Sequence, residues 1–317
     1  MTRFINKIEK KTFLWALTIL ECISSINYSG EHKFIFKMGY SIFSFQEVNP
    51  TDASAAISVY ASIYKSRVEK VVQKEVVFQS YIYNSLREMK DAFEKNNVDL
   101  ISLSVNEYYE LNKSYKITPY LAVSSSDSPF EQYCILKRND RNISKIDDMK
   151  GKTVSIPEYK IHPMLEDWLI NMLAKNKLGP ISKAFGQIKF TDKESNAIYN
   201  VFFKNSDLAV VRKSVFDAVC EFNPQIKNSV SVLASSPPMI IAFTAGNDNA
   251  DQKIVSIIIQ YTGDLQTTQS GKNILNIFKA NKFIKIKKED LKTALDILTE
   301  NEYSKQQLTL KTKKQVK

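Results

Sequence analysis

Beyond residue 33 the chain alternates short apolar runs with segments in which apolar residues recur at helical spacing. The first apolar runs that predict strands lie at 34–44, 76–83 and 98–103. Leu86, Met89 and Phe93 fall on one face of a predicted helix between the second and third runs. The third run is almost continuously apolar, which is typical of a strand buried on both faces of a sheet. Strands that alternate with helices in this way predict a mainly parallel sheet covered by helices.

A second series of strands and helices follows the turn-rich stretch 124–129. Its predicted strands lie at 133–137, 153–156, 187–190, 208–211 and 239–245, and amphipathic helices follow the last of them. Ser144 fits the start of a short helix through a capping pattern, and Gly151 suits the left-handed residue that ends it. Pro163 fits the first turn of a longer helix.

These patterns predict a two-lobed α/β fold in which each lobe is a mainly parallel sheet flanked by helices. The predicted segments are 30–124 for the first part of lobe 1, 125–231 for lobe 2 and 232–303 for the second part of lobe 1. The chain would then cross twice between the lobes, and two crossings make a hinge that can close around a ligand. The lysine-rich segment 304–317 is predicted to be a disordered basic tail.

The N-terminus has the pattern of an export signal. Basic residues precede an apolar run at 13–20, which Glu21 ends. This run is too short to span a membrane, which takes about 20 apolar residues. We expect residues 1–29 to be a signal peptide and the mature protein to be periplasmic or otherwise extracytoplasmic. The alternative is an N-terminal anchor that is not cleaved.

Charge and residue types exclude several classes of function. Much of the net charge of +10 comes from the two ends of the chain, and segment 305–317 alone has five lysines and no acid. The body therefore lacks the basic face that nucleic-acid binding requires. The two histidines have no clustered ligand spacing, so we expect no metal and no cofactor. Cys134 and Cys220 are expected to be buried free thiols, with a single bridge as the alternative.

Catalytic motifs are not evident in the sequence. It has no nucleophile elbow of the form G-x-S-x-G, no P-loop and no dinucleotide-binding glycine motif. We therefore expect a binding protein and not an enzyme.

Three stretches carry a family resemblance. The chain reads ISKIDDMKGKTV at 143–154, NVDLISLS at 97–104 and VFFKNSDLAVV at 201–211. These segments resemble the substrate-binding proteins of phosphonate-type ABC transporters, a group of type 2 periplasmic binding proteins. The resemblance covers about residues 35–300. It is to one branch of the family, and it does not identify the ligand of that branch.

The resemblance implies a type 2 periplasmic-binding-protein fold and a monomer that captures a small anion of the phosphonate, phosphate or carboxylate class. An ABC transporter permease would be the partner. The alternative is an exported sensing module that signals to a partner protein without transport. The sequence departs from the family where specificity is decided: 157–163 reads PEYKIHP in place of a Ser-Thr-Ser run, and Lys193 stands where the family has a histidine.

Ligands of open α/β sheets bind beyond the carboxyl ends of the strands. The residues that this rule selects, together with Lys193, are Glu47, Tyr81, Ser102, Ser104, Asn106, Tyr159, Lys160, His162, Lys193, Arg212 and Ser214. Arg212 follows an apolar strand, and a guanidinium there could hold an anion with two hydrogen bonds. We expect the backbone N–H groups at the helix starts near Ser104 and His162 to assist it.

Most of these residues also have a structural alternative. Ser104, Asn106 and His162 could be helix caps, and Arg212 could form a surface ion pair. The two lysines could be solvated charges, and the two tyrosines could belong to ordinary packing. Acids such as Glu47 and Glu158 near the opening would weaken the case for an anionic ligand.

Overall fold

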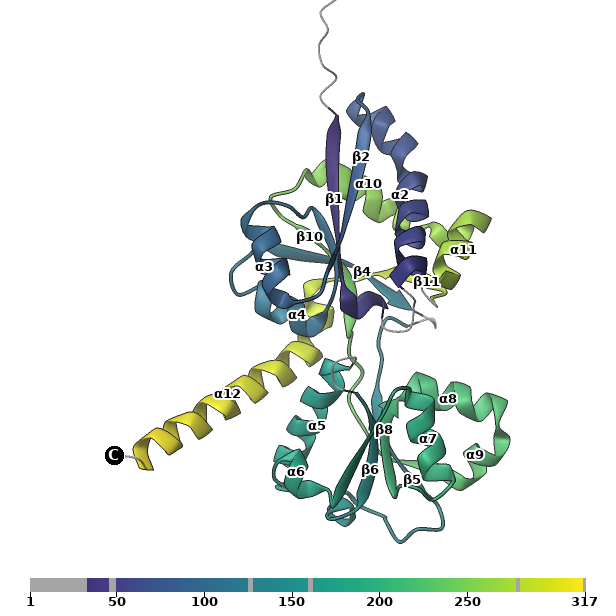
Figure 1. The fold of residues 1–317 in the computed structure, drawn as a ribbon, viewed down its shortest axis with the longest axis vertical. Helices are drawn as coiled ribbons and strands as arrows, with labels where there is room; N and C mark the ends of the chain where they lie inside the picture. The colour runs from purple at the N-terminus through teal and green to yellow at the C-terminus, as the bar shows by residue number, and fades with distance from the viewer. Residues whose placement is uncertain (1–32, 46–49, 125–127, 159–161, 278–279, 316–317) are drawn as a thin grey trace, which may run out of the picture.

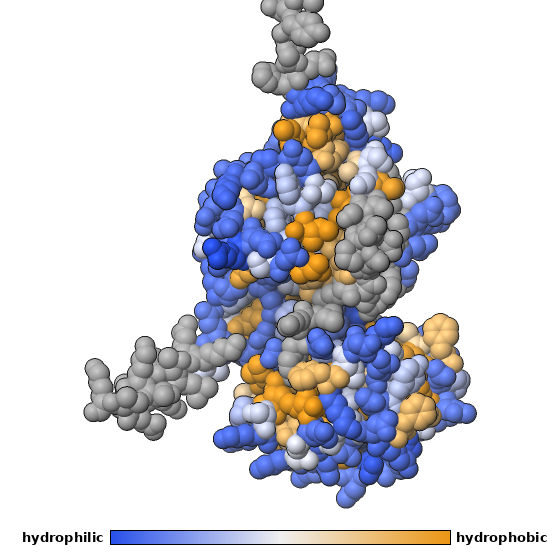
Figure 2. Space-filling view, viewed as in Figure 1, coloured by the Kyte–Doolittle hydropathy of each residue, from blue (hydrophilic) through white to orange (hydrophobic). Residues whose placement is uncertain are grey.

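The computed structural model describes residues 33–45, 50–124, 128–158, 162–277 and 280–315. They form two lobes, one above the other in Figure 1, each built on its own sheet. Most of the face visible in Figure 2 is hydrophilic, with smaller apolar areas on both lobes. Among the described residues, no helix is both long enough and apolar enough to cross a membrane.

Lobe 1 contains a six-stranded sheet in the order β11-β4-β10-β3-β1-β2. Its strands are β1 (Phe34–Ser41), β2 (Val76–Tyr83), β3 (Leu100–Ser104), β4 (Ile117–Ser124), β10 (Ala242–Asn247) and β11 (Lys282–Lys285). β1 is parallel to β2 and β3, whereas β10 is antiparallel to β3 and β4, and β11 is antiparallel to β4. The short η1 (Ile42–Phe45) follows β1.

Helices cover both faces of this sheet. The helices on one face are α2 (Pro50–Val72), α10 (Gln252–Gly263) and α11 (Gln269–Ile277), and those on the other are α3 (Leu86–Glu94) and α4 (Val105–Leu111). Side chains of β1 alternate between these faces, so that Met38 and Tyr40 pack with α10. Gly39 points the other way, where a β-carbon would lie 2.7 Å from the Tyr83 ring. Glycine at this position lets the Tyr83 ring pack against the sheet.

Lobe 2 contains a five-stranded sheet in the order β7-β6-β8-β5-β9. Its strands are β5 (Tyr133–Arg138), β6 (Thr153–Pro157), β7 (Gln187–Thr191), β8 (Leu208–Arg212) and β9 (Val230–Ser235). Its helices are η2 (Ile146–Met149), α5 (Pro163–Lys175), α6 (Ile181–Ala184), α7 (Glu194–Phe202), α8 (Lys213–Phe222) and α9 (Pro224–Ser229). β6 is parallel to β7 and β8, and β5 is antiparallel to β8 and β9. Both sheets are therefore mixed, whereas the sequence predicted mainly parallel ones, because the strands next to the hinge pair antiparallel to their neighbours.

Two connections join the lobes, and they pair with each other. Glu131 lies on the way from β4 to β5, and Met239 lies on the way from β9 to β10. Their backbones exchange two hydrogen bonds of 2.8 and 2.9 Å. Ser236 strengthens this hinge, because its hydroxyl accepts the N–H of Tyr133 at 2.9 Å. The two crossings are therefore one antiparallel unit.

The second crossing lies later in the chain than the predicted boundary at 231/232. β9 runs to Ser235 and pairs with β5, so residues 232–235 belong to the sheet of lobe 2. The apolar run at 230–234 could form a strand in the sheet of either lobe. Its pairing with β5 shows that it belongs to the sheet of lobe 2. The chain therefore returns to lobe 1 over 236–241.

The C-terminal segment also differs from its prediction. The short η4 (Lys288–Leu291) leads into α12 (Lys292–Gln315), whose backbone is helical through most of the segment predicted to be a disordered tail. α12 contacts α4 of lobe 1 and α5 of lobe 2, and then extends away from both lobes (Figure 1). Continuation of the helix gives the backbone of 304–315 the regular hydrogen bonds that a disordered tail would lack.

Candidate functional site

The carboxyl ends of the parallel strands in both lobes lie at the edges that face the hinge. β5 begins at Tyr133, two residues beyond the hinge residue Glu131, and Tyr133 pairs with Arg212 at the end of β8. β10 begins three residues beyond Met239, and its first residue pairs with Ser104 at the end of β3. The sequence rule that ligands bind at these ends therefore points to the hinge-facing edges of the two sheets.

Glu194 and Arg212 form an ion pair at the edge of lobe 2, in which the carboxylate is buried and the guanidinium is partly buried. Glu194 is the first residue of α7, and its carboxylate accepts the backbone N–H of Arg212 at 2.6 Å and the Nε–H at 2.7 Å. The Nη2 atom of Arg212 lies 2.6 Å from the same carboxylate. Burial opposes the charged guanidinium, but attraction to Glu194 and its hydrogen bonds outweigh this and raise the pKa of Arg212. Arg212 is thus held by an acid that the sequence analysis did not select.

His162 lies beside this pair. It is buried immediately before α5, and its Nε2 atom is 4.0 Å from the Glu194 carboxylate. Tyr133 is also buried at this edge, and its ring stacks on that of Trp168 at 6.1 Å. Burial, reinforced by the nearby carboxylates, raises the pKa of Tyr133, so the phenol stays neutral. The Glu194 carboxylate therefore lies beside both a guanidinium group and an imidazole group.

Ser214 and Lys193 occupy the rim of this cluster. Ser214, in the first turn of α8, donates its hydroxyl hydrogen bond to the carboxylate of Glu131. This contact ties α8 to the hinge. Lys193 directly precedes α7 and is exposed.

Ser104 and Asn106, in lobe 1, make structural contacts. Ser104 forms a capping box with Glu107: its hydroxyl accepts the Glu107 N–H at 3.2 Å, and its own N–H donates to the Glu107 carboxylate at 2.8 Å. Asn106 donates across the lobes to the carboxylate of Asp167 in α5 at 2.6 Å. Asn301 of α12 donates to the same carboxylate at 2.9 Å. Asp167 is therefore held from two sides by elements that do not belong to lobe 2.

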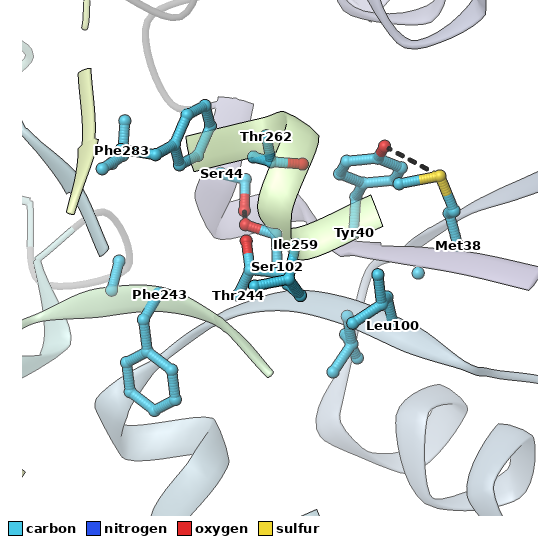
Figure 3. Close-up of a pocket in the computed structure, with 14 residues that line it drawn as sticks. Met38, Tyr40, Ser44, Leu100, Ser102, Phe243, Thr244, Ile259, Thr262 and Phe283 are labelled. Atoms are coloured by element: carbon cyan, nitrogen blue, oxygen red, sulfur yellow. Dashed lines mark hydrogen bonds between the residues drawn. The ribbon is translucent and has the colours of Figure 1, made fainter. Parts of the chain in front are cut away.

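A pocket opens at the hinge-facing edge of lobe 1, on the sheet face that α10 covers. Its volume is about 840 Å³, which includes the solvent at its mouth. Ser44, Ser102, Thr244 and Thr262 bring hydroxyl groups toward its centre, with the Tyr40 and Phe283 rings on opposite sides (Figure 3). The hydroxyls of Ser44 and Ser102 are hydrogen-bonded at 3.1 Å.

Of the predicted site residues that the structure describes, Ser102 alone lines this pocket. Tyr81 lies on the edge strand β2, where its hydroxyl donates to Gln79 at 2.8 Å and its ring stacks on Tyr83. It pairs with Gly39, so its side chain is on the sheet face opposite the pocket. The predicted site residues that lie outside the described residues are Glu47, Tyr159 and Lys160.

The described cysteines and the potential metal ligands were also located. Cys134 and Cys220 are both free and buried. Among the residues that the structure describes, no group of three or more His, Cys, Asp or Glu side chains is placed to hold a metal ion.

Comparison with known protein families identifies the family of this chain. Residues 66–291 match the family of periplasmic phosphonate substrate-binding proteins of ABC transporters. The chain belongs to this family. Its fold is therefore the two-lobed type 2 periplasmic-binding-protein fold that the sequence predicts.

Solved structures share this fold. PhnD1 of Prochlorococcus marinus, solved with methylphosphonate, is 14% identical, with 84% of this chain and 98% of that chain covered and a TM-score of 0.55. A protein of Xanthomonas citri solved with ATP is 13% identical, with 83% of this chain and 95% of that chain covered and a TM-score of 0.59. At such identities the likeness extends to the fold alone.

A curated relative matches over a shorter stretch. It is 4,5-dihydroxyphthalate decarboxylase of Pseudomonas putida, which is 30% identical over 116 residues. The match covers 36% of this chain and 44% of that enzyme, so the chain spans less than half of the relative it matches.

Proposed function

We propose that this protein is an exported solute-binding protein that captures a small anion between its lobes and delivers it to an ABC transporter permease. The observation that carries the proposal is the paired hinge at Glu131 and Met239, which directs the strand ends of both lobes toward each other. Membership of the phosphonate-binding family supports the class of ligand and partner. The two similar structures were solved with methylphosphonate and with ATP, both of which are phosphorus oxyanions.

The cationic groups of lobe 2 support an anionic ligand. Glu194 engages Nε and Nη2 of Arg212, which fixes the orientation of the guanidinium at the end of β8. A planar guanidinium held in this way is suited to a phosphonate or carboxylate, because its donors match two oxygens of the anion. His162 at the start of α5 would add a positive charge when it is protonated.

Calorimetric titration with methylphosphonate, phosphate and methanesulfonate tests the proposal. Replacing Arg212 alone would leave Glu194 buried without its partner, so the informative comparison is Glu194→Gln against the double variant Glu194→Gln/Arg212→Gln. We expect the first to bind anions at least as tightly as wild type. The second should bind about 100-fold more weakly, because it lacks the guanidinium.

Lys213 supplies the matched control. It is the next residue along the chain, and its ammonium group pairs with Asp217 on the exposed side of α8. Lys213→Ala should keep the wild-type affinity within about twofold. Equal affinities for the two Glu194 variants, or a best ligand that is neutral or cationic, would contradict the anion proposal.

A further inference from the structure

The lobe 1 pocket has a different chemistry from the cluster of lobe 2. The described residues that line it include Met38, Leu100 and Ile259 and carry no charged side chain. Its walls are therefore suited to an apolar group, and the Tyr40 and Phe283 rings can contact a flat one. The Ser44–Ser102 pair contains two hydroxyl protons, and the bond between them uses one. The other can be donated to a polar atom of a ligand.

The pocket is also placed to share a ligand with lobe 2. Val123 lines it one residue before the end of β4, where the chain leaves lobe 1. Ala242 lines it as the first residue of β10, where the chain returns. Part of the pocket lining is therefore at the edge that faces lobe 2, as Arg212 is at the facing edge of lobe 2.

We propose that the lobe 1 pocket receives the apolar body of the ligand, so that the ligand is an organic anion with an aromatic or branched substituent. This inference rests on the proposed function, since the anionic group would bind at the Arg212 edge. An inorganic anion such as phosphate, or one with a single methyl group, would leave the pocket unfilled. Burial of a ring-sized group removes apolar surface from water and strengthens binding.

Matched pairs of anions test the inference on the unaltered protein. Phenylphosphonate is compared with methylphosphonate, and benzenesulfonate with methanesulfonate, by calorimetric titration. The member with the ring should bind about tenfold or more tightly in at least one pair, because its ring buries more apolar area. Equal or weaker binding of the ring-bearing anions would overturn the inference and leave the proposed function standing. Failure of every anion to bind would instead overturn the proposed function.

A pocket-filling variant locates the effect. Ala242 shares the pocket face with Thr244, whereas Phe243 between them packs against Tyr108 on the opposite face. Ala242→Leu should weaken phenylphosphonate binding about tenfold and leave methylphosphonate within about twofold. Ser80→Leu, on the exposed edge strand β2, should change neither affinity. Undiminished phenylphosphonate binding by folded Ala242→Leu protein would place the ring elsewhere and refute the pocket as its site.

Discussion

Glu194 has a side chain that is only 4% exposed, and that of its partner Arg212 is 26% exposed. Such a pair contributes little net stability, because the desolvation of both charges offsets their attraction. Removal of one partner is different, since the remaining charge stays buried without compensation. The sequence analysis selected Arg212 because it ends an apolar strand. It could not select Glu194, because an acid in the first turn of a helix reads as an ordinary helix-start residue.

Stability measurements can separate these two effects. Arg212→Ala should lower the free energy of unfolding by about 3–5 kcal/mol, because it leaves the Glu194 carboxylate buried without its guanidinium partner. The double variant Glu194→Gln/Arg212→Gln should recover most of this loss, since no buried charge remains. Urea denaturation followed by circular dichroism measures both. If the double variant were as unstable as the single one, packing and not charge would govern this site.

The thiols offer a second test at the residue scale. Burial raises the pKa of Cys134 from its ordinary value near 9 to about 12, and burial followed by the charge of Asp217 raises that of Cys220. The neutral thiol is thus favoured in the folded protein. The stability that Cys134 contributes through this shift is present below pH 9 and is lost as the pH rises toward 12.

Thiolate is the reactive form of cysteine, so both side chains should resist labelling at pH 8 in the folded protein. Ellman's reagent should react with them only after urea is added. The measurement uses mature protein, which lacks Cys22 if the predicted signal peptide is removed. Rapid labelling without urea would show that these cysteines are accessible.

Helices with local end signals and most of the short apolar strands were predictable from the sequence, whereas β4, β9 and β11 were not. Pro163 begins α5, and Gly151 adopts a φ of +74° two residues beyond the end of η2, as their positions predict. β4 was missed because Pro119 interrupts it, and a proline usually excludes a central strand. The pairing of β4 with β10 shifts register beside Pro119, between Thr244 and Ala245. β11 was missed because four residues flanked by lysines give no clear alternation.

α12 was predicted only for its first turns, and its contacts with both lobes were not predicted. Buried Asn301 donates to the Asp167 carboxylate and to the Asp167 carbonyl oxygen, each at 2.9 Å. Glu300 beside it accepts from Asn171 at 2.7 Å and from Lys175. Polar residues such as Glu300 and Asn301 are expected on the exposed side of a predicted helix. The sequence therefore does not indicate that this helix contacts both lobes.

A double-mutant cycle measures how strongly α12 holds lobe 2. Asn301→Ala should cost about 1.5–3 kcal/mol of unfolding free energy, because a hydrogen bond to a carboxylate is lost. In an Asp167→Ala background the same change should cost much less. Thr299→Ala, two residues away on the exposed side of α12, is the control and should have a small effect. Additive costs for Asn301 and Asp167 would mean that the two side chains do not interact.

At the scale of the whole molecule, the two-lobed fold was predictable because the strand and helix patterns recur in two series. The pocket was not predictable, because its apolar lining residues are expected in the hydrophobic core. Ser102 is the lining residue that was selected by the rule that ligands bind beyond the carboxyl ends of strands. The pocket's lining residues come from β1, η1, β3, β4, β10, α10 and β11. The first and last of them, Met38 and Phe283, are 245 positions apart in the sequence. Only the folded sheet brings them together.

Export from the cytoplasm is a prediction about the whole molecule. Cell fractionation should recover the protein outside the cytoplasm, and mass spectrometry should show that about 24–29 N-terminal residues are missing. The basic segment and apolar run at the N-terminus are the reason. An intact N-terminus on cytosolic protein would exclude the proposed delivery of a solute to a transporter.

The paired hinge limits how the two lobes can move. Two independent linkers would let one lobe slide, tilt and rotate relative to the other. The hydrogen bonds between Glu131 and Met239 fix the offset of the two connections, so sliding would break them whereas bending would not. Under the proposed function, closure of the lobes would therefore be a bending motion and not a sliding one. Each closing event would then bring the same rim of lobe 1 against the same rim of lobe 2, and a ligand that spanned both would meet a single, reproducible geometry.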